Sequence, residues 1–393
     1  GTPSEDQSGA TDARMVDILY GAPGGLGTGT LKSTHFEQGT GTGSLKNSAP
    51  ETGDRTGQAL AAGITDEGEP FLVIGVPGES IGKAAKAGMV IYVHGDTNIA
   101  VTQDSTDVPG AVEAGDGFGG AVAADANHVA VAAPDEAIGT DAGAGNVAVF
   151  SHRLNSEGRP TPLFGLDQDL DTVAGGAEAG DQFGKSLALV TYRPSGATAP
   201  TDSVLVVGSP GKNKTDAGEV ITFHVTAAGS YRQMYVYHSG TADDAAPGTA
   251  EAGDRFGQSV AAVNTAAPEV GTKSTMRLAV GLTDEAIGTT EKAGAIITFS
   301  LLGSREEDNR WIEAGTSGIP GPPGADQHLG QSIRFTGTRL YVGMPYGPGS
   351  HGTVYAVPMS NVTAGGSNAP VTTYTPGQGG LPAAGARFGY VVR

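Results

Sequence analysis

Short apolar runs, each stopped by a proline, glycine or threonine, recur along the whole chain. They occupy 15–23, 71–77, 129–134, 204–210, 278–283 and 340–345. Apolar residues at consecutive positions over such short stretches are typical of strands buried on both faces, and proline ends them because it has no N–H for a strand ladder. A second set of runs follows a glycine, at 88–93, 145–150, 218–223, 294–299 and 352–357. The pattern predicts an all-β protein.

The chain also repeats the motif Ala-Gly-Asp-Xaa-Phe-Gly. Clear copies lie at 114–119, 179–184 and 252–257, and weaker ones at 52–57, 326–330 and 385–389. A unit that returns at a fixed period, here roughly every 60–75 residues, indicates a repeat architecture. Each unit would hold strand A after Phe-Gly, strand B before the stop, strand C after a glycine, and an outer strand D. Four antiparallel strands per repeat predict a β-propeller, with six blades by sequence count and seven possible.

The two ends of the chain are predicted to complete each other. We interpret 388–393 as a strand A without a strand B, and 15–23 as a strand B without a strand A. Pairing of the N- and C-terminal strands would close the ring and hide its last sheet edges. Residues 1–13 are small and polar and are predicted to form a mobile tail, which leaves 14–393 as a single propeller domain.

The residues of the repeat motif have a structural interpretation. Phenylalanine would fill the wedge between neighbouring blades, and aspartate would accept turn N–H groups. The residues expected in these roles are Asp54, Asp116, Phe118, Asp181, Phe183, Asp254, Phe256 and Phe388.

Composition narrows the function classes. The formal net charge is -19, which argues against nucleic acid as a partner because phosphates demand clustered lysine and arginine. There is no cysteine for a disulfide or a thiolate metal site, and no apolar run reaches the ~18 residues of a membrane span. The start at Gly1 lacks methionine and resembles a processed end, so we expect a secreted, extracellular monomer.

The Phe-Gly motif and the Gly-Ala-Pro stops resemble the FG-GAP repeat of integrin α-subunit heads and of many secreted bacterial proteins. The resemblance covers nearly the whole chain and implies a propeller, but it does not specify a function. Blades of that family often carry an Asp-Xaa-Asp-Xaa-Asp-Gly calcium loop between strands A and B. The loops here, at 63–68, 124–128 and 264–269, lack three spaced carboxylates, so no metal and no cofactor is expected. The integrin head also has seven blades, against the six counted here.

Size, acidity and lack of cysteine resemble one kind of secreted bacterial FG-GAP protein. That likeness implies a non-catalytic binding protein that engages a thermolysin-type metalloprotease and promotes its autolysis, and that is a transglutaminase substrate. The loops between strands B and C would form an acidic rim edged by lysines, or only a favoured turn shared by the repeats. The predicted protein-binding residues are Glu79, Lys83, Asp135, Glu136, Lys212, Lys214, Asp284 and Glu285.

Glutamines in mobile polar segments would be the transglutaminase acceptors, because an acyl-transfer enzyme needs a locally extended chain. Gln7 and Gln38 fit this best, and the alternative is that they only interact with solvent. Two other function classes stay open. A polysaccharide lyase or hydrolase would need carboxylates or histidines converging in the central channel, and an adhesion or envelope-interaction module would depend on divalent cations. No catalytic residue is predicted, because the sequence has neither a His-Glu-Xaa-Xaa-His nor a Gly-Xaa-Ser-Xaa-Gly motif.

Overall fold

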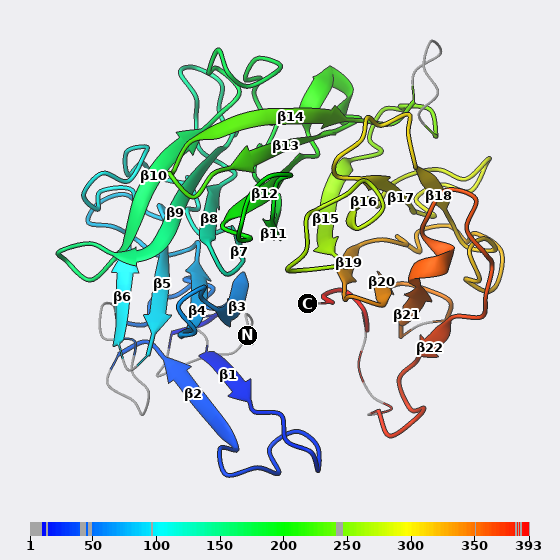
Figure 1. Cartoon of the computed structure of the whole chain (residues 1–393), viewed down its shortest axis with the longest axis horizontal. Coiled ribbons are helices and arrows are strands. Elements are labelled where there is room, and N and C mark those ends of the chain that lie inside the picture. The colour runs from blue at the N-terminus through cyan, green and yellow to red at the C-terminus, as the bar shows by residue number, and fades with distance from the viewer. Residues whose placement is uncertain are drawn as a thin grey trace. The chain divides into compact units, whose positions relative to one another are not determined.

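The computed structural model of the chain is all-β (Figure 1). It describes residues 10–12, 15–39, 45, 49–95, 97–240, 247–349, 351–381, 383, 385 and 387–392. These residues form five four-stranded sheets and one two-stranded sheet, in which every pairing is antiparallel. Two compact units, 1–166 and 167–393, are described separately. Within the described residues, no helix is long and apolar enough to cross a membrane.

The first unit holds the two-stranded sheet and two four-stranded sheets. The two-stranded sheet pairs β1 (Met15–Leu19) with β2 (Ser33–Glu37). The next sheet runs β3 (Leu60–Ile64), β4 (Pro70–Val76), β5 (Met89–His94) and β6 (Thr97–Val101). The third runs β7 (Ala121–Ala124), β8 (His128–Ala133), β9 (Asn146–Leu154) and β10 (Pro160–Leu166).

The second unit holds three four-stranded sheets. Its first sheet runs β11 (Ser186–Tyr192), β12 (Asp202–Ser209), β13 (Glu219–Val225) and β14 (Tyr231–Tyr237). The second runs β15 (Phe256–Asn264), β16 (Met276–Leu282), β17 (Ala295–Ser300) and β18 (Arg310–Ile312). The third runs β19 (Ser332–Phe335), β20 (Arg339–Met344), β21 (Thr353–Pro358) and β22 (Thr372–Tyr374). Two short helical turns, η1 (Lys212–Asp216) and η2 (Met359–Asn361), lie between strands.

Apart from 15–23, whose strand β1 has only one buried residue, the apolar runs correspond to buried strands. Every residue of β16 and β17 is buried, and so are all residues of β12 except the first. The fourth strands β14 and β22 are more exposed, as expected for strands on the outside of a repeat. Apolar side chains of neighbouring sheets form the cores, for example Val280 with Phe256 and Val206. The prediction of four-stranded antiparallel repeats is therefore confirmed for five sheets.

Each Phe-Gly loop that follows a sheet within a unit is bonded to that preceding sheet. The backbone N–H of Phe118 donates to the carbonyl of Ala87 (2.8 Å), and that of Phe256 donates to Ala217 (2.9 Å). The approach is so close that a Cβ on Gly88 would lie 2.3 Å from the carbonyl oxygen of Phe118. Glycine is therefore required before strand C, because any side chain there would push the Phe-Gly loop away.

The N-terminal strand β1 is a third strand, not the second strand that its Gly-Ala-Pro ending predicted. The carbonyls of Thr11 and Asp12 accept hydrogen bonds from Gly53 N (3.0 Å) and Arg55 N (3.3 Å). The next repeat has two corresponding bonds just before β5. There Gly115 N and Gly117 N donate to the carbonyls of residues 85 and 86. The sheet β1–β2 thus corresponds to strands C and D.

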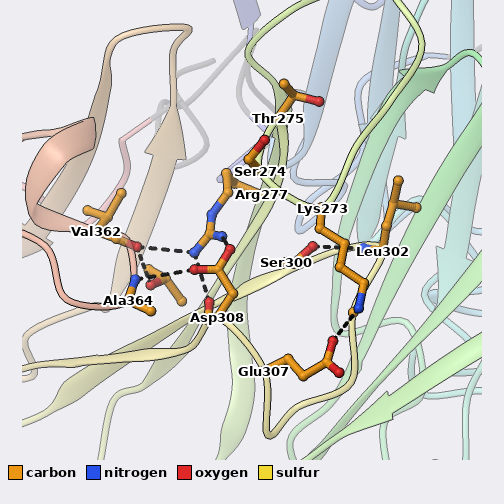
Figure 2. Close-up of polar contacts among 12 residues, drawn as sticks. Lys273, Ser274, Thr275, Arg277, Ser300, Leu302, Glu307, Asp308, Val362 and Ala364 are labelled. Carbon is orange, nitrogen blue, oxygen red and sulfur yellow. Dashed lines mark hydrogen bonds and ion pairs between the residues drawn. The ribbon is translucent and has the colours of Figure 1, made fainter.

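A buried arginine joins sheet β15–β18 to sheet β19–β22 in the second unit. Arg277 on β16 is 0% exposed and forms an ion pair with Asp308, which lies in the loop before β18 (Figure 2). Its guanidinium also donates to the carbonyls of Asp308 (3.1 Å) and Val362 (3.3 Å). Thr298 donates to the same Val362 carbonyl at 2.6 Å. Burial lowers the pKa of Arg277, and Asp308 opposes that shift.

Candidate functional site

The aspartate of each Asp-Xaa-Phe-Gly loop is buried. Asp54, Asp116, Asp181 and Asp254 are 0%, 3%, 1% and 2% exposed. In each, Oδ2 accepts the backbone N–H of the residue three positions earlier, at 2.6 to 2.9 Å. The predicted role of these aspartates in their turns is confirmed. Phe118, Phe183 and Phe256 are fully buried, while Phe388 is half-buried and bridges Gly352.

One side chain from the B–C loop lies near Asp54, Asp181 and Asp254. The third repeat shows its place directly, because Lys212 Nζ lies 2.8 Å from Asp181 Oδ2. The equivalent residues are found from one shared backbone bond, in which the glycine before strand C donates to their carbonyl. Gly218 N donates to Lys212, and the matching bonds end on Glu79, Glu136 and Glu285. Three other repeats therefore have a glutamate at the position that Lys212 occupies in its own repeat.

These glutamates are buried and paired with glutamines or acids. Glu79 accepts a hydrogen bond from Gln38 (3.0 Å), and Glu136 accepts one from Gln103 (2.7 Å). Burial, with nearby Asp54 and Glu51, raises the pKa of Glu79 to about 8. Burial, with Asp254, Glu251 and Glu313, likewise raises the pKa of Glu285 to about 8.

The predicted solvent-facing rim is therefore wrong for half of its residues. Glu79, Glu136, Lys212 and Glu285 are 6%, 7%, 6% and 6% exposed. The first three are held inward because they bond to the buried residues Gln38, Gln103 and Asp181. Asp135 and Lys83 are exposed as expected, and Asp284 is half-buried. The side chain of Lys214 lies outside the described residues.

The two glutamines predicted as transglutaminase acceptors differ in outcome. Gln7 lies outside the described residues. Gln38 is 1% exposed and accepts a hydrogen bond from Thr56 at 2.6 Å, in addition to its bond to Glu79. The expectation that Gln38 lies in a mobile polar segment is wrong, because its amide is needed inside a buried polar cluster.

A partly exposed polar ladder in the second unit was missed by the sequence reasoning. Its members come from the Xaa position of the repeat and from the residue after the strand B stop. Arg255 Nε lies 3.5 Å from Asp284 Oδ2, and His328 Nδ1 lies 2.9 Å from Asp284 Oδ1. The His328 and Tyr346 rings meet edge to face at 5.3 Å, and the Arg387 guanidinium lies 5.5 Å from the Tyr346 ring centroid. We call Arg255, Asp284, His328, Tyr346 and Arg387 the polar ladder.

The Xaa residues have a backbone conformation that side chains disfavour. Arg255, His328 and Arg387 have φ of 56°, 51° and 64°, and Gln182 has 55°. Gly117 holds the same position in another copy with φ of 65°, so the turn itself accepts glycine. Long polar side chains in left-handed conformation cost about 1–2 kcal/mol each, and such outliers gather at functional sites. The repeating Xaa position was visible in the sequence, but nothing there showed that it points to the surface.

A hollow lies at one end of the polar ladder. Arg255, Gln182, Gln258 and Asp216 are among the residues that line it. The side chain of Arg255 is 51% exposed, so its guanidinium is open to a ligand. The lining contains both a cation, Arg255, and a carboxylate, Asp216. Among the described residues, no group of three or more histidine, aspartate or glutamate side chains has metal-binding geometry.

No family model matches the chain, and no curated protein is significantly similar to it. The FG-GAP resemblance therefore stays a prediction from the repeated motif. The described repeat loops bury acidic side chains and vary at the Xaa position, which is Arg255, His328, Arg387, Gln182 or Gly117.

Proposed function

We propose that the chain is a non-catalytic, secreted binding protein whose polar ladder contacts a protein partner. The observation that supports this is the alignment of Arg255, Asp284, His328, Tyr346 and Arg387 along successive repeat loops. Arginine and tyrosine are enriched in the energetically important parts of protein interfaces. The ladder is held by rigid buried loops, which lowers the entropy lost on binding.

We further propose that the sheets form a six-bladed β-propeller of the FG-GAP kind. Phe388 N donates to the carbonyl of His351 (2.8 Å), which repeats the bond by which earlier Phe-Gly loops begin a new sheet. The segment after Phe388 would then be the first strand of the β1–β2 sheet and would close the ring. Deletion of 388–393 should lower the melting temperature markedly, whereas an unchanged temperature would contradict ring closure.

For the partner, we propose a thermolysin-type metalloprotease whose autolysis the protein promotes. The support is the likeness in size, acidity and repeat motif to the secreted bacterial dispase autolysis-inducing protein. We also propose that the chain is a transglutaminase substrate. Among the described glutamines, Gln378 in the loop after β22 is exposed and meets the accessibility that the enzyme needs. Amine labelling by a transglutaminase, mapped by mass spectrometry, should modify Gln378 and spare Gln38 in the folded protein.

The experiment that tests the partner is incubation with a thermolysin-type protease, with protease fragments followed on gels. The active protease should disappear faster, the binding protein should stay intact, and a catalytically dead protease should persist. An Arg255→Ala/Arg387→Ala variant should lose the effect. Arg232→Ala is the matched control, because Arg232 is exposed on the outer strand β14 and lies outside the polar ladder. Equal activity of both variants would remove the polar ladder from the proposal.

One observation favours an enzyme as the second candidate. Asp284 and His328 form a carboxylate–imidazole pair, with Tyr346 and Arg255 beside it. A base, a phenol and a guanidinium are the groups that a lyase acting on acidic polysaccharide would use. Incubation with polyuronate, followed by ultraviolet absorbance of the unsaturated product, tests this. Formation of that product by the wild type and not by His328→Ala would replace the binding proposal.

A further inference from the structure

Glutamine side chains supply hydrogen bonds to buried acids of the B–C loops. Gln38 Nε2 donates to Glu79 Oε2 at 3.0 Å, and Gln103 Nε2 donates to Glu136 Oε2 at 2.7 Å. In both pairs the glutamine follows strand D of one sheet, and the glutamate precedes strand C of the next sheet. The carboxamide of one repeat therefore provides an N–H donor to a buried carboxyl group of the following repeat.

The strand register defines the position of these glutamines. Each lies two residues after the strand D residue that pairs with the second residue of strand C. Gln168, which donates to Glu219 at 3.2 Å, lies at the same position. The three defining pairs are Phe36 with Val16, Val101 with Val90, and Leu166 with Val147. In the next repeat Tyr237 pairs with Val220, so the corresponding residue is Ser239. A serine thus stands where three other repeats have a glutamine.

Ser239 and the B–C residue of the repeat that follows it, Glu285, each bury an oxygen atom. The two residues are 1% and 6% exposed. Among the described residues, neither Ser239 Oγ nor Glu285 Oε2 has a hydrogen-bond partner. A serine hydroxyl is attached directly to Cβ and ends short of the place that a glutamine carboxamide reaches. Unpaired buried polar atoms cost free energy, and proteins commonly satisfy them with an internal water molecule.

The repeat after that one shows the arrangement when the acid is absent. Gly347 lies at its B–C position, two residues after the stop at Pro345, and Ala314 lies at the position of the glutamine. A Cβ on Gly347 would lie 2.5 Å from Cγ of Gln327, so the Gln327 side chain fills the space beside this loop. This loop has neither the acid nor the facing polar residue, whereas Ser239 and Glu285 retain one on each side.

We propose that a small hydrogen-bond donor, a water molecule or an ammonium ion, binds between Ser239 and Glu285 in place of the missing carboxamide. It bonds to Ser239 Oγ and to Glu285 Oε2, so both oxygens gain a partner. Water donates to Oε2 when the carboxyl group is ionised and accepts from it when it is protonated. An ammonium ion only donates, but the charged groups that face Glu285 are the acids Asp254, Glu251 and Glu313, which favour a cation.

Electron density tests the site directly. A crystal structure of the whole chain should show one peak within about 2.5–3.2 Å of both Ser239 Oγ and Glu285 Oε2. A protein side chain in that place, or no peak at all, would overturn the proposal.

Two substitutions at Ser239 test the same site through stability. Ser239→Gln supplies the carboxamide from the chain itself, so it should raise the melting temperature by a few degrees and displace the peak. Ser239→Ala should lower the melting temperature, because the bound donor loses one of its two partners. If Oγ has no partner at all, Ser239→Ala removes an unpaired buried group and raises the melting temperature instead. That result would contradict the proposal even if the glutamine variant does not fold.

The next repeat offers the matched control. Ala314→Gln puts the same side chain at the equivalent position, beside Gly347, where Gln327 already fills the space. It should therefore lower the melting temperature. Equal gains from Ser239→Gln and Ala314→Gln would show that the substitution does not act through an unfilled site.

The choice of salt separates the two ligands. Melting temperatures of the wild type and of Ser239→Gln are measured in ammonium chloride and in sodium chloride at equal ionic strength. A higher value for the wild type in ammonium chloride, absent from Ser239→Gln, identifies ammonium as the ligand. Equal values in the two salts, together with the density peak, identify water. A gain from ammonium that is equal in both proteins excludes ammonium from this site.

Discussion

The two ends of strand β16 each bury a charged side chain, with opposite solutions. At the start of the strand, Arg277 meets an acid and two backbone carbonyls (Figure 2). Just beyond its end, Glu285 faces three more acids, and its Oε2 has no hydrogen-bond partner within the described part of the chain. A charge that is matched fixes the local structure at every physiological pH. A charge that faces its own kind depends on a proton, so its stability follows the solvent.

The largest effect on stability is expected from removing Arg277, the buried charge that has a counter-ion. Arg277→Met should lower the free energy of unfolding by about 3–5 kcal/mol, because the carbonyls of Asp308 and Val362 lose a buried donor and Asp308 loses its counter-ion. Denaturant titration measures this. Lys273→Met is the control, since Lys273 forms an exposed pair with Glu307 in the same view and should leave stability unchanged (Figure 2). Equal unfolding midpoints for the two variants would contradict the role of Arg277.

The next effect concerns the loop in which the chain supplies its own cation. Lys212→Met should cost about 3 kcal/mol at about pH 8, because it leaves Asp181 buried and unpaired. The loss should shrink at about pH 5, where Asp181 can hold a proton; burial already raises the pKa of that carboxyl. Urea titrations at both pH values test this, and a loss independent of pH would show that the lysine acts through packing alone.

A smaller effect, of opposite sign, is expected at the unmatched end. Glu285→Gln should raise stability by about 1 kcal/mol at about pH 8 and leave it unchanged at about pH 4. The sign follows because the folded pKa of Glu285 is raised to about 8, so the wild type loses stability as the pH rises toward that value. Melting temperatures of both proteins across this range give the difference. A variant that is less stable at every pH would argue that the glutamate makes a needed hydrogen bond.

The smallest effect is expected at the polar ladder. Arg255→Gly should be more stable than Arg255→Ala by about 1 kcal/mol, since φ is 56° and only glycine adopts it without strain. The melting temperatures of the two variants, measured by calorimetry, test this difference in stability. If alanine is the more stable of the two, the left-handed turn at this position is not strained.

The sequence allowed the sheets and their buried aspartates and phenylalanines to be predicted, because strand periodicity and a repeated turn are local signals. Sequence reasoning failed for residues whose burial depends on contacts with a neighbouring repeat. Glu79 and Glu285 look like surface acids in the sequence, but they are buried near Asp54 and Asp254 of the repeat-motif loops. The prediction for Gln38 was wrong for the same reason. The N-terminal strand was misassigned because Gly-Ala-Pro after β1 resembles the stop of a second strand, while the deciding bonds come from residues 53 and 55.

The Xaa position of the repeat has a consequence for how such a protein can change. Arginine, glutamine, histidine and glycine all occupy it with a similar positive φ, and His328 does so between Gln327 and Leu329, where the aspartate and the phenylalanine are both replaced. A single substitution at this position can therefore change the chemistry of the surface while the fold stays the same. The loops serve as ready attachment points for engineered recognition, in the way that hypervariable loops do on an antibody framework.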